Sequence, residues 1–223
     1  MMRTVGILGG MGPDATVALM ARVIARVAAR DDADHVPLLV DQNTAVPSRI
    51  AYLIEGQGAD PGPVLVAMAR RLAGAGAQAL ALACNTAHHW AGDIRAAADL
   101  PFLDMVALSV AQAGAAEVGI LASPAVRMAG VYDRACAAAG VVPVFGADEG
   151  ALLALVRRIK AEGAHDGTRA ALRALSQALV PRVQIIACTE FSLVADAVAP
   201  GVRAIDAMDV LAQAIVDFAK GGV

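Results

Sequence analysis

The 223-residue sequence predicts an α/β fold with two pseudo-symmetric lobes, each a mainly parallel sheet flanked by helices. Short apolar runs alternate with longer alanine-rich segments, a pattern typical of chains in which strands and helices alternate. Hydrophobic residues make up 58% of the chain and aromatic residues only 3%, which allows a large aliphatic core and excludes intrinsic disorder. Two short motifs also recur, in the same order, in the second half of the chain.

Eight apolar runs are the predicted strands. Most of them are continuous rather than alternating, which is typical of parallel strands buried on both faces. In chain order they are Val5–Leu8, Val36–Val40, Gln78–Cys84, Phe102–Val106, Val118–Leu121, Val141–Phe145, Val183–Cys188 and Val202–Ile205.

Longer alanine-rich segments between these runs are the predicted helices. Their alternation with the strands indicates helices on both sides of a parallel sheet. In chain order they are Asp14–Ala29, Val64–Ala73, Trp90–Ala97, Val126–Ala139, Ala151–Lys160, Gly167–Leu179 and Met208–Lys220.

The internal repeat predicts the division into lobes. The Val-Gly-Ile-Leu that begins at Val5 returns at Val118, and the segment Leu82–Thr86 resembles Ile186–Glu190 at nearly the same spacing. We therefore expect a first lobe of residues 1–108 plus 207–223 and a second lobe of residues 109–206.

Composition excludes several function classes. The net charge of −3 leaves no basic excess for nucleic acid. The longest uncharged stretch, Leu72–Gly92, is interrupted by glycines and polar residues, so we expect no membrane span. The glycines and the proline near the N-terminus argue against a signal peptide, and we expect a cytoplasmic protein. Three cysteines are too few for a disulfide framework, and no Cys-x-x-Cys or His-x-x-x-His spacing predicts a metal site.

Two of the three cysteines stand where ligands bind in such folds. Cys84 and Cys188 each end an apolar run and are followed at once by polar, turn-forming residues. Ligands of open α/β sheets sit at the carboxyl ends of strands, where the N-terminus of the next helix favours a thiolate. Cys136 lies within a predicted helix, and we expect an inert buried residue there.

A pair of thiols in a cleft between two lobes predicts a reaction class. One thiolate removes a proton from a carbon atom, and the opposing thiol returns a proton to the other face. Such a step inverts a stereocentre without redox chemistry or hydrolysis. We therefore expect the active site in the cleft between the lobes, with Cys84 and Cys188 on its two sides.

Motifs along nearly the whole chain resemble the cofactor-independent aspartate/glutamate racemase family, and most closely its aspartate racemase branch. The matching motifs occur in the family's order. They are Gly9-Gly10-Met11-Gly12-Pro13 with Ala15-Thr16; Asn43-Thr44 with Pro47 and Arg49; Ala83–His88; Val118–Ser123 with Gly130 and Tyr132; Ile159-Lys160 with Gly163; and Cys188-Thr189-Glu190.

The resemblance implies roles for these residues. Cys84 and Cys188 would be the two catalytic acid/bases, each serving one enantiomer as base. Arg49 and Lys160 would bind carboxylates of an acidic amino acid, for which a bidentate guanidinium and an ammonium are suited. The remaining substrate-binding residues would be Met11, Asn43, Thr44, Asn85, Thr86, Ser123, Thr189 and Glu190. The resemblance further implies a small amino acid substrate, no cofactor, no metal and a homodimer.

The chain departs from the family pattern at several positions. Phe191-Ser192 replaces Leu-Pro after Glu190, and Ser48 replaces an aspartate before Arg49. Ala122-Ser123-Pro124-Ala125-Val126 replaces Ala-Thr-x-Gly-Thr. Racemisation stays favoured because both cysteines are present. The choice between aspartate and glutamate as substrate stays open. The effects of Ala125, Val126 and Ser192 on substrate specificity also stay open. Val126 with Phe191 would favour a substrate with a less polar side chain.

Other functions remain as alternatives. Gly10–Ala15 fits a dinucleotide-binding fingerprint, but Asp31, Asp32 and Asp34 lie before the second predicted strand and not at its end. A pyridoxal-phosphate racemase would need Lys160 or Lys220, the chain's two lysines, as its Schiff-base residue. A cysteine-dependent decarboxylase or isomerase of the same superfamily, or a non-catalytic homologue that binds small carboxylates, also remains open.

Overall fold

The computed structural model describes residues 2–222 and divides into two compact units. One unit comprises Met1–Met105 and Met208–Val223, and the other comprises Val106–Ala207. Each unit contains a four-stranded sheet whose neighbouring strands are all parallel. The predicted α/β class with two lobes is confirmed.

The sheet of the first unit has the strand order β2-β1-β3-β4. Its strands are β1 (Val5–Gly9), β2 (Leu38–Gln42), β3 (Ala79–Leu82) and β4 (Phe102–Leu103). Gly9 of β1 lies opposite Gln42 of β2, and Leu8 lies opposite Leu82 of β3. The three strands therefore end at the same edge, and the loops that follow them share one side of the unit.

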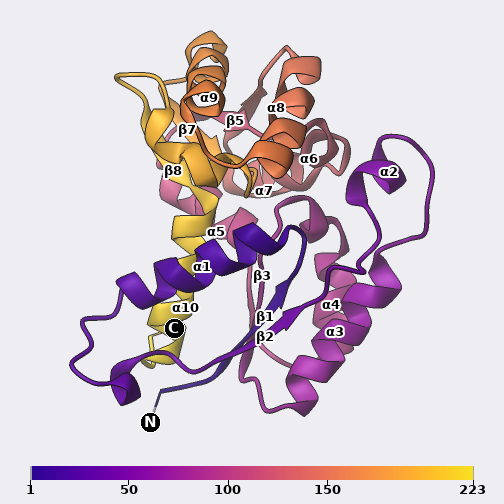
Figure 1. Cartoon of the computed structure of the whole chain (residues 1–223), viewed down its shortest axis with the longest axis vertical. Coiled ribbons are helices and arrows are strands. Elements are labelled where there is room, and N and C mark those ends of the chain that lie inside the picture. Colours follow the sequence, from indigo (N-terminus) through magenta and orange to yellow (C-terminus); the bar gives the residue numbers. More distant parts are fainter. Residues whose placement is uncertain (1, 223) are drawn as a thin grey trace. The chain divides into compact units, whose positions relative to one another are not determined.

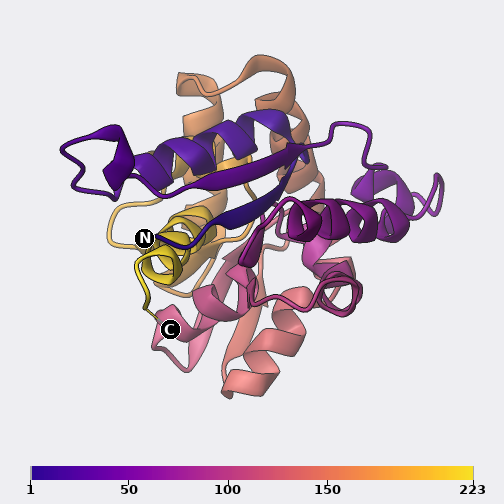
Figure 2. The same cartoon turned by 90° about the horizontal axis from the view of Figure 1, so that it is seen from below.

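Helices cover both faces of this sheet. On one face lie α3 (Gly62–Gly74) and α4 (Ala91–Ala97), and on the other lie α1 (Pro13–Ala25) and α10 (Ala207–Ala219) (Figure 1). The indigo helix α1 and the yellow helix α10 lie against each other and cross (Figure 2). Arg22 and Arg26 of α1 pair with Asp209 of α10 at 3.1 and 2.7 Å, so the C-terminal helix is tied to the first helix of the chain.

Three short helices complete the first unit. The 3-10 helix η1 (Asp32–Asp34) precedes β2, and α2 (Arg49–Leu53) follows that strand. The 3-10 helix η2 (Thr86–Trp90) lies between β3 and α4.

The second unit repeats this topology. Its sheet has the order β6-β5-β7-β8, made of β5 (Glu117–Leu121), β6 (Val142–Phe145), β7 (Val183–Ile186) and β8 (Arg203–Asp206). The two copies of the Val-Gly-Ile-Leu motif are β1 and β5, which hold the same place in their sheets. The cysteine motifs follow β3 and β7, which also correspond, so the sequence repeat coincides with a repeat of the fold.

The helices of the second unit follow the order of its strands. They are α5 (Met105–Ala113), α6 (Pro124–Met128), α7 (Val131–Ala139), α8 (Glu149–Glu162), α9 (Asp166–Ala178) and the 3-10 helix η3 (Phe191–Ala197). No helix within residues 2–222 is long and apolar enough to cross a lipid bilayer.

Each sheet packs its own hydrophobic cluster. In the first unit, side chains of β1 and β3 meet those of α3 and α4, with Leu8, Met68 and Ile94 fully buried. In the second unit, side chains of β5 and β7 meet those of α8, α9 and η3. Both clusters are mainly aliphatic, as the low aromatic content predicts, with one buried aromatic residue in each, Trp90 and Phe191.

Two predicted elements differ from the structure. The predicted strand Phe102–Val106 ends at Leu103, and the rest of it begins α5 at Met105. The predicted helix Val126–Ala139 is two helices, α6 and α7, because Gly130 between them has a φ of +62°. That left-handed conformation is open to glycine and interrupts helical hydrogen bonding.

Candidate active site

The glycine-rich loop after β1 is held in place by a side chain of α1. The backbone N–H of Gly10 donates to Oγ1 of Thr16 at 2.9 Å. Gly10 has a φ of +88°, and a Cβ there would lie 2.4 Å from the backbone oxygen of Asn43. Only glycine therefore lets the loop after β1 touch the loop after β2, which joins the segments of Met11 and Asn43.

Arg49 at the start of α2 binds this glycine-rich loop without using a carboxylate. Its Nη2 donates to the backbone oxygen of Met11 at 3.1 Å, and its Nη1 donates to that of Pro47 at 3.0 Å. Its Nε is buried and has no hydrogen-bond partner, and Arg49 forms no ion pair with any residue in 2–222. Arg49 therefore retains a guanidinium charge that neutral carbonyls orient but do not balance.

Cys84 stands just beyond the end of β3. The N–H of Ala83 donates to the backbone oxygen of Leu8 at 3.1 Å, which continues the parallel ladder to the residue before the cysteine. Cys84 is 5% exposed, and Asn85 and Thr86 beside it are buried. Thr86 begins η2, so the thiol lies at a strand-to-helix turn as the sequence predicts.

His88 supports the backbone of Cys84. Its Nδ1 lies 2.9 Å from the carbonyl oxygen of Cys84, and because a carbonyl only accepts, this nitrogen carries the proton. Burial lowers the pKa of His88, and Asp104, 3.8 Å from Nε2, opposes that shift. The neighbouring His89 is exposed. Within residues 2–222, no three His, Cys, Asp or Glu side chains are grouped so that they could hold a metal ion.

Cys188 occupies the corresponding place in the second unit. The N–H of Ala187 donates to the oxygen of Leu121 at 2.8 Å, just as Ala83 bonds to the end of β1 in the first unit. Cys188 is also 5% exposed. The two cysteines therefore follow equivalent strands, are reached by equivalent backbone hydrogen bonds and are equally buried.

A carboxylate touches the sulfur of Cys188. Oε2 of Glu190 lies 3.1 Å from Sγ and accepts the thiol proton, and Oγ1 of Thr189 lies 3.5 Å from the same oxygen. Nζ of Lys160, on α8, lies 3.3 Å from Oε1 of Glu190. Burial raises the pKa of the Cys188 thiol well above its usual value, and the charge of Glu190 raises it further. Four of the residues expected at the site are thus brought into one contact network.

Ser123 and Ser192 are also buried in the second unit. Ser123 precedes α6, and its side chain makes no capping hydrogen bond there. The hydroxyl of Ser192 donates to Oδ1 of Asp206, at the end of β8, at 2.6 Å. Sequence reasoning missed Asp206 and Asp104 as polar anchors near the cysteine turns. Their only sequence signal is position: Asp206 directly follows the predicted run Val202–Ile205, and Asp104 interrupts the run Phe102–Val106.

Some residues noted in the sequence serve packing. Cys136 lies on α7 and is fully buried, and burial raises the pKa of its thiol to about 11, as expected for an inert residue. Phe191 is fully buried in the aliphatic cluster of the second unit, where it packs with Leu121 and Ile186. Its side chain therefore fills the core of this unit, which leaves the suggestion that it favours a less polar substrate without support.

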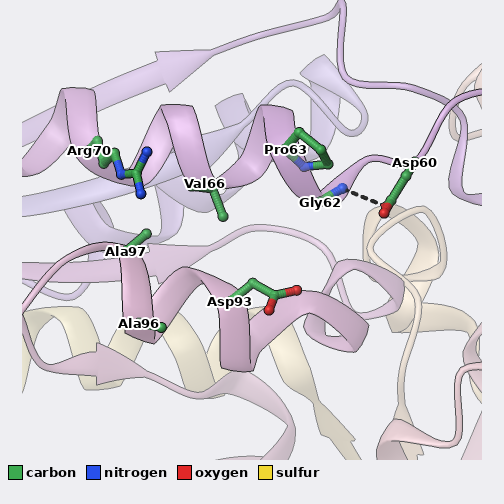
Figure 3. A pocket seen from close by; sticks show the side chains of 8 residues that line it. All are labelled: Asp60, Gly62, Pro63, Val66, Arg70, Asp93, Ala96 and Ala97. Carbon is green, nitrogen blue, oxygen red and sulfur yellow. Dashed lines mark hydrogen bonds between the residues drawn. The ribbon is translucent and has the colours of Figure 1, made fainter.

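An open depression of about 380 Å³ lies between α3 and α4 (Figure 3). Arg70 of α3 and Asp93 of α4 border it, and the N–H of Gly62 donates to Oδ1 of Asp60 at its end. None of the residues expected at the site lines it. It is lined by Asp60, Gly62, Pro63, Val66, Arg70, Asp93, Ala96 and Ala97.

Solved structures of several racemases share this fold. An aspartate racemase from Picrophilus torridus superposes with a TM-score of 0.82 at 24% identity, covering 98% of this chain and 94% of that one. A putative Asp/Glu racemase from Yersinia pestis gives 0.79 at 22% identity, covering 98% and 100%. A glutamate racemase from Thermus thermophilus, in complex with β-chloro-D-alanine, gives 0.62 at 20% identity, covering 96% and 79%.

The sequence itself matches one family model over almost its whole length. The Asp/Glu/Hydantoin racemase model matches residues 8–215, which include both cysteine turns, the glycine-rich loop and Lys160. The two sheets, the repeated cysteine turns and this match agree with one another. The chain belongs to the Asp/Glu/Hydantoin racemase family.

Proposed function

We propose that this protein is a cofactor-independent racemase that inverts the α-carbon of aspartate or glutamate by proton transfer between Cys84 and Cys188. The single observation that carries the proposal is the equivalence of the two cysteines. Each follows the third strand of its unit in chain order, at the carboxyl edge of a parallel sheet, and each is 5% exposed. Two-sided proton transfer needs an acid/base group for each face of the α-carbon, and the duplicated fold provides two thiols in equivalent positions.

The charges of the candidate residues fit an acidic amino acid. Arg49 has a guanidinium that no carboxylate in residues 2–222 balances, whereas Lys160 and Glu190 neutralise each other. Arg49, Lys160 and Glu190 together therefore have one positive charge in excess, before the charge of a thiolate is counted. Aspartate and glutamate each have two carboxylates and one ammonium group, and so a net charge of −1. The buried Nε of Arg49 is one of the donors available to a carboxylate oxygen.

The chemical step is a proton exchange at carbon. One thiolate takes the α-proton, and the electron pair of the C–H bond stays on the substrate as a carbanion. The other thiol donates its proton to the opposite face, and the electron pair of its S–H bond stays on sulfur. Fixed cations such as Arg49 stabilise the charge that builds on the substrate during this step.

Heavy water tests this function. The protein is incubated in D2O with the L and D forms of aspartate and glutamate, and α-deuteration is followed by NMR together with chiral analysis. We expect deuterium in the product enantiomer, while unreacted substrate keeps its proton early in the reaction. Cys84→Ser and Cys188→Ser should each lower racemisation by about 10²–10⁴-fold, the usual contribution of one general acid or base.

Cys136→Ser is the matched control, because it removes a buried thiol outside both cysteine turns and should leave the racemisation rate unchanged. The proposal fails if either Cys84→Ser or Cys188→Ser racemises at the native rate. It also fails if the native protein binds both amino acids without exchanging the α-proton.

A further inference from the structure

Glu190 makes the two cysteines chemically unequal. Its carboxylate accepts the Cys188 thiol proton at 3.1 Å, and its side chain is only 10% exposed. In the first unit, Thr86 occupies the equivalent position two residues after Cys84. The Cys84 sulfur makes no hydrogen bond with any residue in 2–222. The duplicated turns thus share their backbone but differ by one carboxylate.

We propose that Glu190 is a positioning residue that holds the proton of the acid/base pair on Cys188 in the resting enzyme, and that Lys160 limits its effect. This assignment rests on the proposed function for its catalytic meaning, but the contacts on which it depends lie within one unit. A thiolate at Cys188 would place two negative charges about 3 Å apart, and like charges at such distances oppose ionisation.

Lys160 partly neutralises the negative charge of Glu190. Its ammonium lies 3.3 Å from the far oxygen of Glu190 and is 43% exposed. It reduces the negative potential at the sulfur while leaving Oε2 free to accept the thiol proton. Glu190, which immediately precedes η3, and Lys160, from α8, are the charged side chains in this network within residues 2–222, together with Thr189 as a neutral member.

For one enantiomer the reaction begins from this resting form, whereas the other enantiomer reacts from the form with a proton on Cys84 and a thiolate at Cys188. The Cys84 thiolate takes the α-proton, the Cys188 S–H bond breaks, and its proton forms the new C–H bond while the electron pair stays on sulfur. The enzyme is left with a proton on Cys84 and a thiolate at Cys188. Cys188 then recovers a proton from water as Cys84 loses one to water, so that the proton count is unchanged over the cycle.

Alkylation of Cys188 tests the assignment without turnover. In a Cys84→Ser/Cys136→Ser background, only Cys188 reacts with iodoacetamide, and the midpoint of its rate against pH reports thiol ionisation. Glu190→Gln removes the neighbouring charge and should lower this midpoint by about one pH unit or more. Lys160→Gln should raise it, and Glu190→Asp should restore most of the native value.

Glu162→Gln is the matched control. It neutralises an exposed glutamate on the same helix as Lys160, paired with Arg158 and His165, and should leave the midpoint unchanged. Circular dichroism establishes that each variant is folded. An unchanged midpoint in folded Glu190→Gln overturns the assignment. If that variant does not fold, an unchanged midpoint in Lys160→Gln overturns it.

A second readout concerns turnover. In Glu190→Gln the alkaline limb of the pH profile of kcat/KM should move to lower pH, because Cys188 loses its proton more easily. This shift should be equal for both enantiomers. The catalytic part of the assignment is contradicted if the alkylation midpoint moves in this variant while the alkaline limb of kcat/KM does not. If the protein racemises neither amino acid while the alkylation midpoint still moves, the proposed function fails and the effect of Glu190 on Cys188 stands.

Discussion

Cys136 and Cys188 are both buried thiols with a raised pKa, yet their surroundings differ. Burial is the main cause in each case, and a carboxylate adds to it, Asp133 for Cys136 and Glu190 for Cys188. Only Cys188 donates a hydrogen bond to its carboxylate and stands at the carboxyl edge of a sheet. Burial and a raised pKa alone therefore do not distinguish the candidate site thiol from the thiol that only packs, whereas its place at the carboxyl end of a strand does.

His88 provides a prediction at the same scale. Burial lowers its pKa in the folded protein below the value of the unfolded chain, so the unfolded state binds more protons as the pH falls. The stabilising contribution of neutral His88 is therefore complete above the unfolded pKa of about 6.5 and is lost as the pH falls below it. We expect urea unfolding to show a steeper loss of stability between pH 7.5 and 5.5 for the native protein than for His88→Gln. Parallel losses in the two proteins would contradict this.

At the scale of elements, the loop between β1 and α1 depends on one glycine. Gly10→Ala would strain a φ of +88° and place a Cβ 2.4 Å from the backbone of Asn43, so the loops after β1 and β2 must separate. Gly58 is the matched control, because its φ is +85° and the nearest atom to its Cβ would be 3.8 Å away.

We expect Gly58→Ala to lower the free energy of unfolding by about 1–2 kcal/mol, the conformational penalty alone. Gly10→Ala should lower it by more, because backbone atoms must also move. Urea unfolding of both variants measures the difference. Equal losses would mean that the contact with Asn43 does not constrain the loop.

At the scale of the whole molecule, the second unit is continuous in sequence and the first is not. The segment Val106–Ala207 has its own sheet and its own aliphatic cluster. The first unit needs the C-terminal helix, whose Phe218 lies under the guanidinium of Arg3 at 3.7 Å and whose Asp209 pairs with α1.

We therefore expect a fragment of residues 105–207 to unfold cooperatively on its own, since it keeps every element of its sheet. A fragment of residues 1–105 lacks α10 and should not. Thermal unfolding followed by circular dichroism distinguishes the two. A fragment 105–207 without a cooperative transition would show that its core depends on the rest of the chain.

Most of the fold could be predicted from local patterns. Each of the eight apolar runs overlaps an observed strand, and the repeat of Val-Gly-Ile-Leu predicted two similar units. The position of Cys84 and Cys188 after strands followed from the polar residues next to them. The errors came where a local signal was ambiguous: Met105 and Val106 are as apolar as a strand yet begin α5, and Gly130 divides a segment that is otherwise alanine-rich.

The sequence by itself determined the strands, their alternation with helices and the family, because burial periodicity, turn residues and motif order are properties of neighbouring residues. Only the tertiary structure decided which charges meet. Lys160 reaches Glu190 across thirty positions of the chain, His88 approaches Asp104, and Arg49 meets the carbonyl of Met11 instead of a carboxylate. Such pairings depend on how strands and helices pack in space, since Coulomb forces and hydrogen bonds act through distance and not through sequence order.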